Sequence, residues 1–122
     1  MTISSKELGR VGEEMAIVFL LQQGYSIVEQ NYRNDLGELD VVAYDKDVLC
    51  FIEVKTRQDD EKGSPFEAIT RSKQRKLFHM AQSYLKHKQI KETAARFDVI
   101  GIQLDLPEES QVKIVKNAFE MS

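Results

Sequence analysis

Two acidic residues and a lysine near the middle of the chain have the types and spacing of a metal-binding hydrolytic site. Asp40 ends the segment Gly37-Glu38-Leu39-Asp40, and Glu53 and Lys55 end an apolar segment. Carboxylate oxygens suit Mg²⁺ or Mn²⁺, and such a cation polarises a phosphodiester and lowers the pKa of bound water. Lys55 would orient that water or stabilise the growing negative charge. The residue types therefore predict metal-dependent phosphodiester hydrolysis.

These three residues can meet if they lie on neighbouring strands. Residues 38–44 and 48–56 are rich in β-formers and are separated by a short polar segment, which predicts a tight hairpin. With a two-residue loop, Asp40 lies opposite Glu53, with Cβ atoms roughly 4.5–5.5 Å apart. Glu53 and Lys55 share a face because strand side chains alternate. A slip of one residue would send Asp40 to the other face.

A structural ion pair is the other explanation for this pattern. Opposed carboxylates destabilise a sheet, and burying them adds to the cost. Either Lys55 alone offsets that cost, through a buried ion pair, or a divalent cation does. Spacing leaves both explanations open.

The elements that must position these residues follow the order α-β-β-β-α-β-β. Helical periodicity, caps and turn residues predict a helix over about 6–23, strands over 25–32, 38–44 and 48–56, a helix from Ser64 toward residue 90 with a break near 70–72, and strands over 97–104 and 111–115. This order predicts an α/β sandwich, with a mixed sheet of about five strands and helices on both faces. The length of 122 residues suits one domain, 1–122.

Composition narrows the classes of protein further. A single cysteine, Cys50, excludes a disulfide framework and a Cys-rich zinc site. No apolar stretch approaches the roughly 20 residues that cross a bilayer, and the N-terminus lacks a signal-peptide layout, so we expect a cytoplasmic protein without a membrane partner. The net charge of −3 counts against strong nucleic-acid binding, but residues 71–91 carry only basic charges. That run is either a solvated helix face or a phosphate-binding surface.

Motifs along nearly the whole chain resemble a known family. Asp40 with Glu53-Val54-Lys55 resembles the PD-(D/E)XK nuclease signature, although Leu39 stands where the strict signature has proline. The chain more closely resembles the YraN-like family, which is similar to archaeal Holliday junction resolvases. The matching segments are Gly9-x-x-Gly12-Glu13-x-x-Ala16, Gly24-Tyr25, Asn31-Tyr32-Arg33, residues 37–42, residues 51–57, Gly63-Ser64-Pro65, Lys73 and residues 96–99.

The resemblance implies a restriction-endonuclease-like fold and a divalent-metal-dependent DNA endonuclease, with branched DNA as one candidate substrate. It also implies that Glu13 joins Asp40 and Glu53 around the metal, and that the protein forms a homodimer. Gly12 would let another segment approach closely beside Glu13. The alternative is a non-catalytic nucleic-acid-binding or assembly module that keeps the fold. We expect Asp98 to be structural. The candidates for phosphate contacts are Arg33, Arg57, Arg71, Lys73, Arg75 and Lys76.

Overall fold

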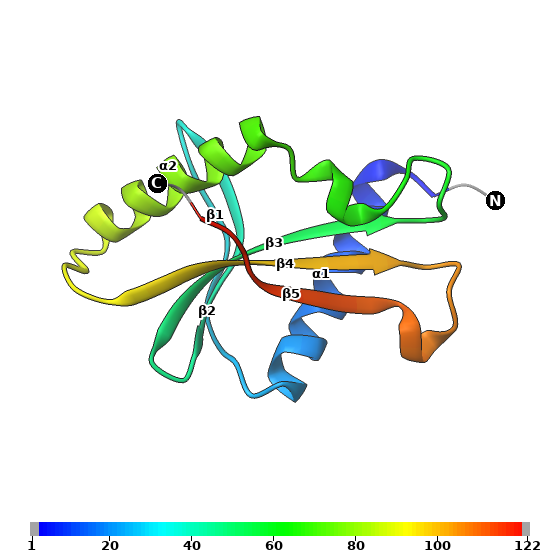
Figure 1. The fold of residues 1–122 in the computed structure, drawn as a ribbon, viewed down its shortest axis with the longest axis horizontal. Coiled ribbons are helices and arrows are strands. Elements are labelled where there is room, and N and C mark those ends of the chain that lie inside the picture. The colour runs from blue at the N-terminus through cyan, green and yellow to red at the C-terminus, as the bar shows by residue number, and fades with distance from the viewer. Residues whose placement is uncertain (1–2, 121–122) are drawn as a thin grey trace.

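A five-stranded mixed sheet with a long helix on each side forms the framework of the protein (Figure 1). The computed structural model describes residues 3–120. Its elements are α1 (Ser5–Gln22), β1 (Ser26–Asn34), β2 (Gly37–Asp45), β3 (Val48–Arg57), the 3₁₀ helix η1 (Pro65–Ala68), α2 (Arg71–His87), β4 (Ala94–Gln103), the 3₁₀ helix η2 (Glu108–Ser110) and β5 (Val112–Phe119). The predicted fold class and the order of its elements are confirmed.

The strands are arranged in the sheet in the same order as in the sequence, from β1 to β5. All neighbours are antiparallel except β3 and β4, which run parallel because η1 and α2 form the crossover between them. The register of the β2–β3 hairpin is the expected one, with Asp45 opposite Val48 and Val41 opposite Ile52. β3 is therefore central, and its residues 49–53 are all buried.

The first helix forms for the reasons that the sequence suggests. The Ser4 hydroxyl accepts a hydrogen bond from the Glu7 N–H and caps α1, and Gly24 follows the helix with a positive φ of 89°. Ala16 and Leu20 are fully buried and pack against Val41 and Ile52 of the sheet. α1 thus covers one face of the sheet.

The second predicted helix is divided in two. Ser64 caps η1, which ends at Ala68, and the Thr70 hydroxyl then accepts a hydrogen bond from the Lys73 N–H to start α2. The expected break near residues 70–72 therefore falls just before Arg71. Tyr84 of α2 packs against Phe51 on the face of the sheet opposite α1. η1 lies over the carboxyl end of β3 (Figure 1), and the segment after it brings Ile69 and Lys73 to the same pocket as Glu53 and Lys55.

The part of the chain between residues 3 and 120 holds no helix long and apolar enough to cross a membrane.

Candidate functional site

The site lies where β2 and β3 separate. Their pairing runs from Asp45–Val48 to Val41–Ile52, and the next residue of β2 is Asp40. At that point the Asp40 Oδ2 atom accepts a hydrogen bond of 2.9 Å from the Val54 N–H. The side chain of Asp40 thus replaces the backbone acceptor that the separated strand no longer supplies.

An irregularity in the sheet sets the position of Asp40. Leu39 and Val42 both pack on the α2 side, whereas Val41 packs on the α1 side, so the alternation of β2 is interrupted at Asp40. In β1, the residue across from this point is Asn31, which has a positive φ of 53°. Strict alternation, which the sequence prediction assumed, therefore does not hold at this position.

Asp40 and Glu53 are close enough to share a proton. Burial raises the pKa of Asp40 to about 8, and the hydrogen bond to Glu53 and its negative charge contribute to the same rise. Glu53 is buried, with 6% of its surface exposed. The structure therefore brings these two carboxyl groups together, as the hairpin register predicts.

The positively charged side chain that pairs with Glu53 is Lys73, from α2. Its Nζ atom lies 2.9 Å from the Glu53 Oε2 atom. Burial disfavours the charge on Lys73, but attraction to Glu53 and Asp40 raises its pKa overall. Sequence reasoning placed Lys73 among the phosphate contacts and missed its position beside Glu53. The only signal was the family motif, because the contact depends on where the crossover sets α2.

Lys55 lies between two pockets at the carboxyl end of β3. The smaller pocket, of about 320 Å³, is lined by the acidic pair, Lys55 and Lys73, together with Val54, Ala68 and Ile69. The larger, of about 500 Å³, is formed by the start of α1, the end of β3 and the loop after it, and it also includes Asp40 and Lys55. These two residues are thus accessible from both sides.

Glu13 faces the larger pocket. An added Cβ atom at Gly12 would lie 1.7 Å from Thr56 Oγ1, so glycine at this position lets α1 approach β3 closely, as predicted. With its amide nitrogen toward the acids, Asn31 donates to Glu13 Oε1 at 2.7 Å and to Glu38 Oε1 at 2.9 Å. Burial and the negative charges of Asp40 and Glu38 raise the pKa of Glu13.

The donor set fits a hard divalent cation that uses two protein carboxylates. Within residues 3–120, no three acidic, histidine or cysteine side chains form a ready metal-binding group. Asp40 instead shares one pocket with Glu53 and the other with Glu13. Mg²⁺ usually takes one or two carboxylates and keeps several waters. The pair of Asp40 and Glu53 meets that requirement, whereas the predicted role of Glu13 as a third ligand stays a prediction.

The other predicted phosphate contacts have different environments. Arg57 lines the larger pocket, and its Nε atom is buried with no hydrogen-bond partner among the described residues. Arg33 is exposed and pairs with Glu38 at 3.1 Å. The remaining three lie on the exposed surface of α2: Arg71, Arg75 and Lys76. The structure thus brings Arg57 and Lys73 to the pockets and leaves the others on the surface.

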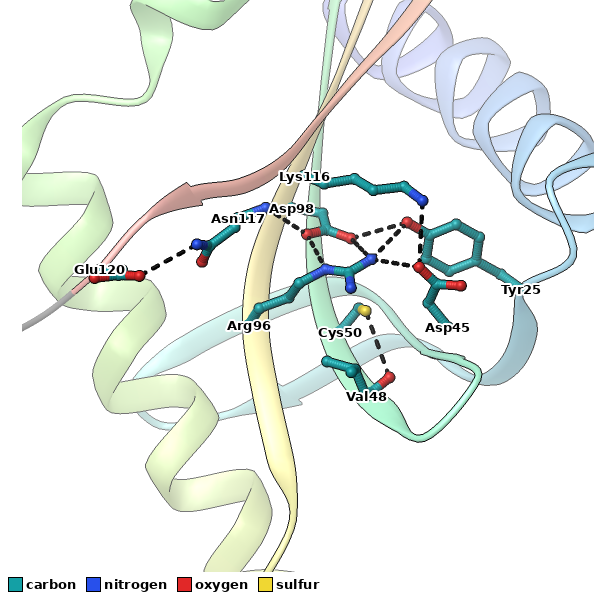
Figure 2. A network of polar contacts seen from close by, with 9 residues as sticks. All are labelled: Tyr25, Asp45, Val48, Cys50, Arg96, Asp98, Lys116, Asn117 and Glu120. Atoms are coloured by element: carbon teal, nitrogen blue, oxygen red, sulfur yellow. Dashed lines mark hydrogen bonds and ion pairs between the residues drawn. The ribbon is translucent and has the colours of Figure 1, made fainter.

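Asp98 belongs to a separate network on the face of the sheet that α1 covers (Figure 2). Its carboxylate is 1% exposed and accepts hydrogen bonds from Tyr25 Oη, from Arg96 Nε and from the Asn117 N–H, at 3.0, 2.8 and 2.9 Å. Arg96 also pairs with Asp45 at 2.7 Å. Because donors surround this carboxylate, it ties the middle of β4 to β5 and to Tyr25, which supports the structural role expected from the sequence.

Comparison with known proteins identifies the family. Residues 12–102 match the model of the uncharacterised protein family UPF0102. A UPF0102 protein of Chlorobium phaeobacteroides is 45% identical over 102 residues, covering 84% of this chain and 81% of its own length. One from Caldicellulosiruptor saccharolyticus is 39% identical, covering 96% of this chain and all of its own. One from Clostridium botulinum is 44% identical, covering 99% and 100%. The chain therefore belongs to the family UPF0102, and the resemblance inferred from the motifs is confirmed.

Proposed function

We propose that this protein is a divalent-cation-dependent endonuclease that hydrolyses DNA phosphodiester bonds beside Asp40 and Glu53. The observation that carries the proposal is a pair of neighbouring carboxyl groups at an open pocket, of which only Glu53 has an ion pair among the described residues. If both carboxyl groups were ionised, they would have one ion pair between them, that of Glu53 with Lys73. Such an arrangement destabilises the fold unless a proton or another cation joins it.

Each neighbouring residue supports part of this chemistry. Asp40 and Glu53 would hold the cation, which when bound supplies Lewis-acid stabilisation of the phosphate and a more acidic water. In the hydrolysis, the water oxygen bonds to phosphorus, one P–O bond to a sugar oxygen breaks, and the attacking water gives up a proton to solvent or to a carboxylate. The leaving sugar oxygen takes a proton from solvent and becomes a hydroxyl group. Lys55 borders both pockets, where its ammonium group can donate to a phosphate oxygen or orient the water.

In the larger pocket, Arg57 would bind phosphate and Glu13 would act on the cation. Arg57 lines the larger pocket, where its guanidinium group would donate to the oxygens of a bound phosphate. Glu13 would act on the cation from the side of α1, directly or through a water, as the family resemblance implies. The larger pocket is therefore the side from which we expect the DNA backbone to enter.

The exposed basic residues of α2 would extend the contact with DNA. Arg71, Arg75 and Lys76 follow the smaller pocket along one helix and face solvent. They would contact phosphates on either side of the cut, and such contacts would position the duplex without reading its sequence. Branched DNA as the substrate and a homodimer as the active form follow from the resemblance alone.

A non-catalytic nucleic-acid-binding or assembly module is the second candidate. The net charge of −3 favours it. Such a module would bind DNA through α2 and leave the bond intact.

A cleavage assay separates the two candidates. Labelled linear, flapped and four-way DNA would be incubated with the protein and Mg²⁺ or Mn²⁺, with EDTA as the metal-free reaction. We expect cutting by the wild type, and its loss in Asp40→Asn, Glu53→Gln and Lys55→Met. These substitutions keep the size of each side chain, so a loss of cutting reports on charge and donors.

Glu14→Gln is the matched control. Glu14 neighbours Glu13 on α1, but its side chain is 67% exposed and pairs with Arg10 on the surface. It should cut like the wild type. Cutting that persists in Asp40→Asn would refute the assignment of the site, and DNA binding without cutting under all conditions would favour the non-catalytic module.

A further inference from the structure

Lys73 differs from the other basic residues of α2 because it is already bound to an acid. It lies in the first turn of α2, where Thr70 caps its backbone N–H, and its ammonium group contacts Glu53 at 2.9 Å. The Glu53 side chain is 7% exposed, whereas 43% of the Lys73 side chain is exposed. The acid is therefore fixed in the protein, and the lysine reaches it from the rim of the pocket.

This contact supplies the charge that the site needs when no divalent cation is bound. Lys73 provides the only ion pair of Glu53 within residues 3–120, and Asp40 and Glu38 also attract it. A lysine holds its charge on a flexible four-carbon stem, and the stem can move without a change in the backbone. By contrast, Arg96 in the network around Asp98 is fixed by several hydrogen bonds.

A divalent cation and Lys73 would compete for the same oxygen atoms. A cation held by Asp40 and Glu53 would lie within a few ångströms of the ammonium group, and like charges at that separation repel strongly. The flexible, half-exposed side chain is the partner that can leave. Its stem remains anchored on α2 at the rim of the pocket, next to Arg71, so the freed ammonium group would remain beside any phosphate bound there.

We propose that Lys73 is an exchangeable counter-ion: it neutralises Glu53 in the cation-free protein, is displaced when a divalent cation binds, and then contacts the substrate phosphate. This proposal rests on the proposed function, since it requires a cation and a phosphate at the same pair of acids. Lys73 would then couple cation binding to DNA binding. The exposed Arg71, Arg75 and Lys76 of α2 would instead contact DNA whether or not a cation is bound.

A thermal unfolding experiment with Mn²⁺ tests the first step. Lys73→Met removes the counter-ion, so the variant should have a lower Tm than the wild type in EDTA, and Mn²⁺ should remove most of the difference. Equivalently, Lys73→Met should bind Mn²⁺ about tenfold more tightly, within the usual range of coupling between two sites. If Lys73 stayed paired with Glu53 beside the bound cation, Lys73→Met would lower the Tm by the same amount with and without Mn²⁺. That result would overturn the proposal.

Two further variants make this test firm. Lys73→Gln keeps a hydrogen-bond donor for Glu53 and replaces Lys73→Met if that variant does not fold. Lys86→Met removes the same charge from the exposed last turn of α2, and it should respond to Mn²⁺ like the wild type. A Lys86→Met response equal to that of Lys73→Met would show a general effect of charge and would refute a specific exchange.

Fluorescence anisotropy with a labelled DNA duplex tests the second step. Ca²⁺, which also takes oxygen ligands, would replace Mn²⁺ to limit cutting during the titration. When Ca²⁺ is present, Lys73→Met should weaken DNA binding and reduce the salt dependence of the DNA affinity by about one phosphate contact. In EDTA it should change neither. An equal loss in EDTA would show a permanent phosphate contact and would overturn the exchange.

The outcomes distinguish this proposal from the proposed function. If Mn²⁺ does not stabilise the wild type at all, both are refuted. If Mn²⁺ stabilises the wild type but not Asp40→Asn, and Lys73→Met behaves like the wild type, then the cation site stands and only the role of Lys73 is refuted.

Discussion

The raised pKa of Asp40 predicts how the stability of the cation-free protein depends on pH. The pKa is about 8 in the folded protein, against an ordinary value of 3.8, because burial and Glu53 disfavour the charged form. Between these two values the folded state binds more protons than the unfolded state. The free energy of unfolding therefore falls as the pH rises through this window, and the full loss is present above pH 8.

The size of the effect follows from the same values. A shift from 3.8 to about 8 corresponds to roughly 5–6 kcal/mol without screening. Asp40 lies beside two pockets and is only partly buried, so solvent reduces the effect to about 2–3 kcal/mol. For a domain of this size, that is a fall in Tm of about 10 °C.

Asp40→Asn isolates this contribution. The amide can accept the Val54 N–H and donate to Glu53, so it imitates the protonated acid at every pH. In EDTA, the variant should match the wild type near pH 4 and exceed it by about 2–3 kcal/mol at pH 9. Urea unfolding followed by circular dichroism, at intervals across that range, measures the difference. Parallel pH profiles for the two proteins would refute the reasoning. They would show that the pKa of Asp40 does not differ between the folded and the unfolded state.

Three other substitutions test the framework of the site. Gly12→Ala should destabilise the fold by about 2 kcal/mol or more, because its Cβ atom would overlap Thr56, whereas Gly9→Ala has open space and should be neutral or stabilising in urea unfolding. Asp98→Ala should cost about 3 kcal/mol by removing the acceptor of Arg96, yet leave the gain in Tm on adding Mn²⁺ unchanged, since the Asp98 network lies on the α1 face of the sheet, away from Lys73 of α2. Replacing Arg75 by Gln should reduce the salt dependence of DNA binding by about one contact with or without a cation, and an unchanged slope would remove that residue from the interface.

The parts of the fold that depend on local signals were predictable from the sequence. The cap at Ser4, the turn at Gly24 and the register of the β2–β3 hairpin all follow from nearby residues. β4 begins at Ala94, three residues before its predicted start, because pairing with β3 recruits residues that have no strand preference of their own. Similarly, β5 continues to Phe119, whose ring stacks on Phe97 at 4.7 Å.

The site was predictable only as far as strand geometry reaches. The convergence of Asp40 and Glu53 follows from the hairpin register, but the contact of Lys73 with Glu53 depends on the path of residues 58–72 after β3, which no local pattern encodes. The interruption of β2 at Asp40 was missed for a related reason. It arises with the positive φ of Asn31 in the neighbouring strand, and asparagine tolerates that conformation without requiring it.

The two buried acidic groups of this protein show why a structural ion pair is an incomplete account of Asp40 and Glu53. On the α1 face of the sheet, the Asp98 carboxylate is surrounded by donors from Tyr25, Arg96 and the backbone of Asn117, and its charge is matched (Figure 2). Beside the pocket that Ile69 and Lys73 border, Glu53 has the ion pair and Asp40 holds a proton at neutral pH instead. The structural ion pair therefore accounts for Glu53 but not for the Asp40 carboxyl group, which is raised in pKa at an open pocket. A divalent cation held by both carboxylates would take the place of that proton, and this supports the proposed cation site.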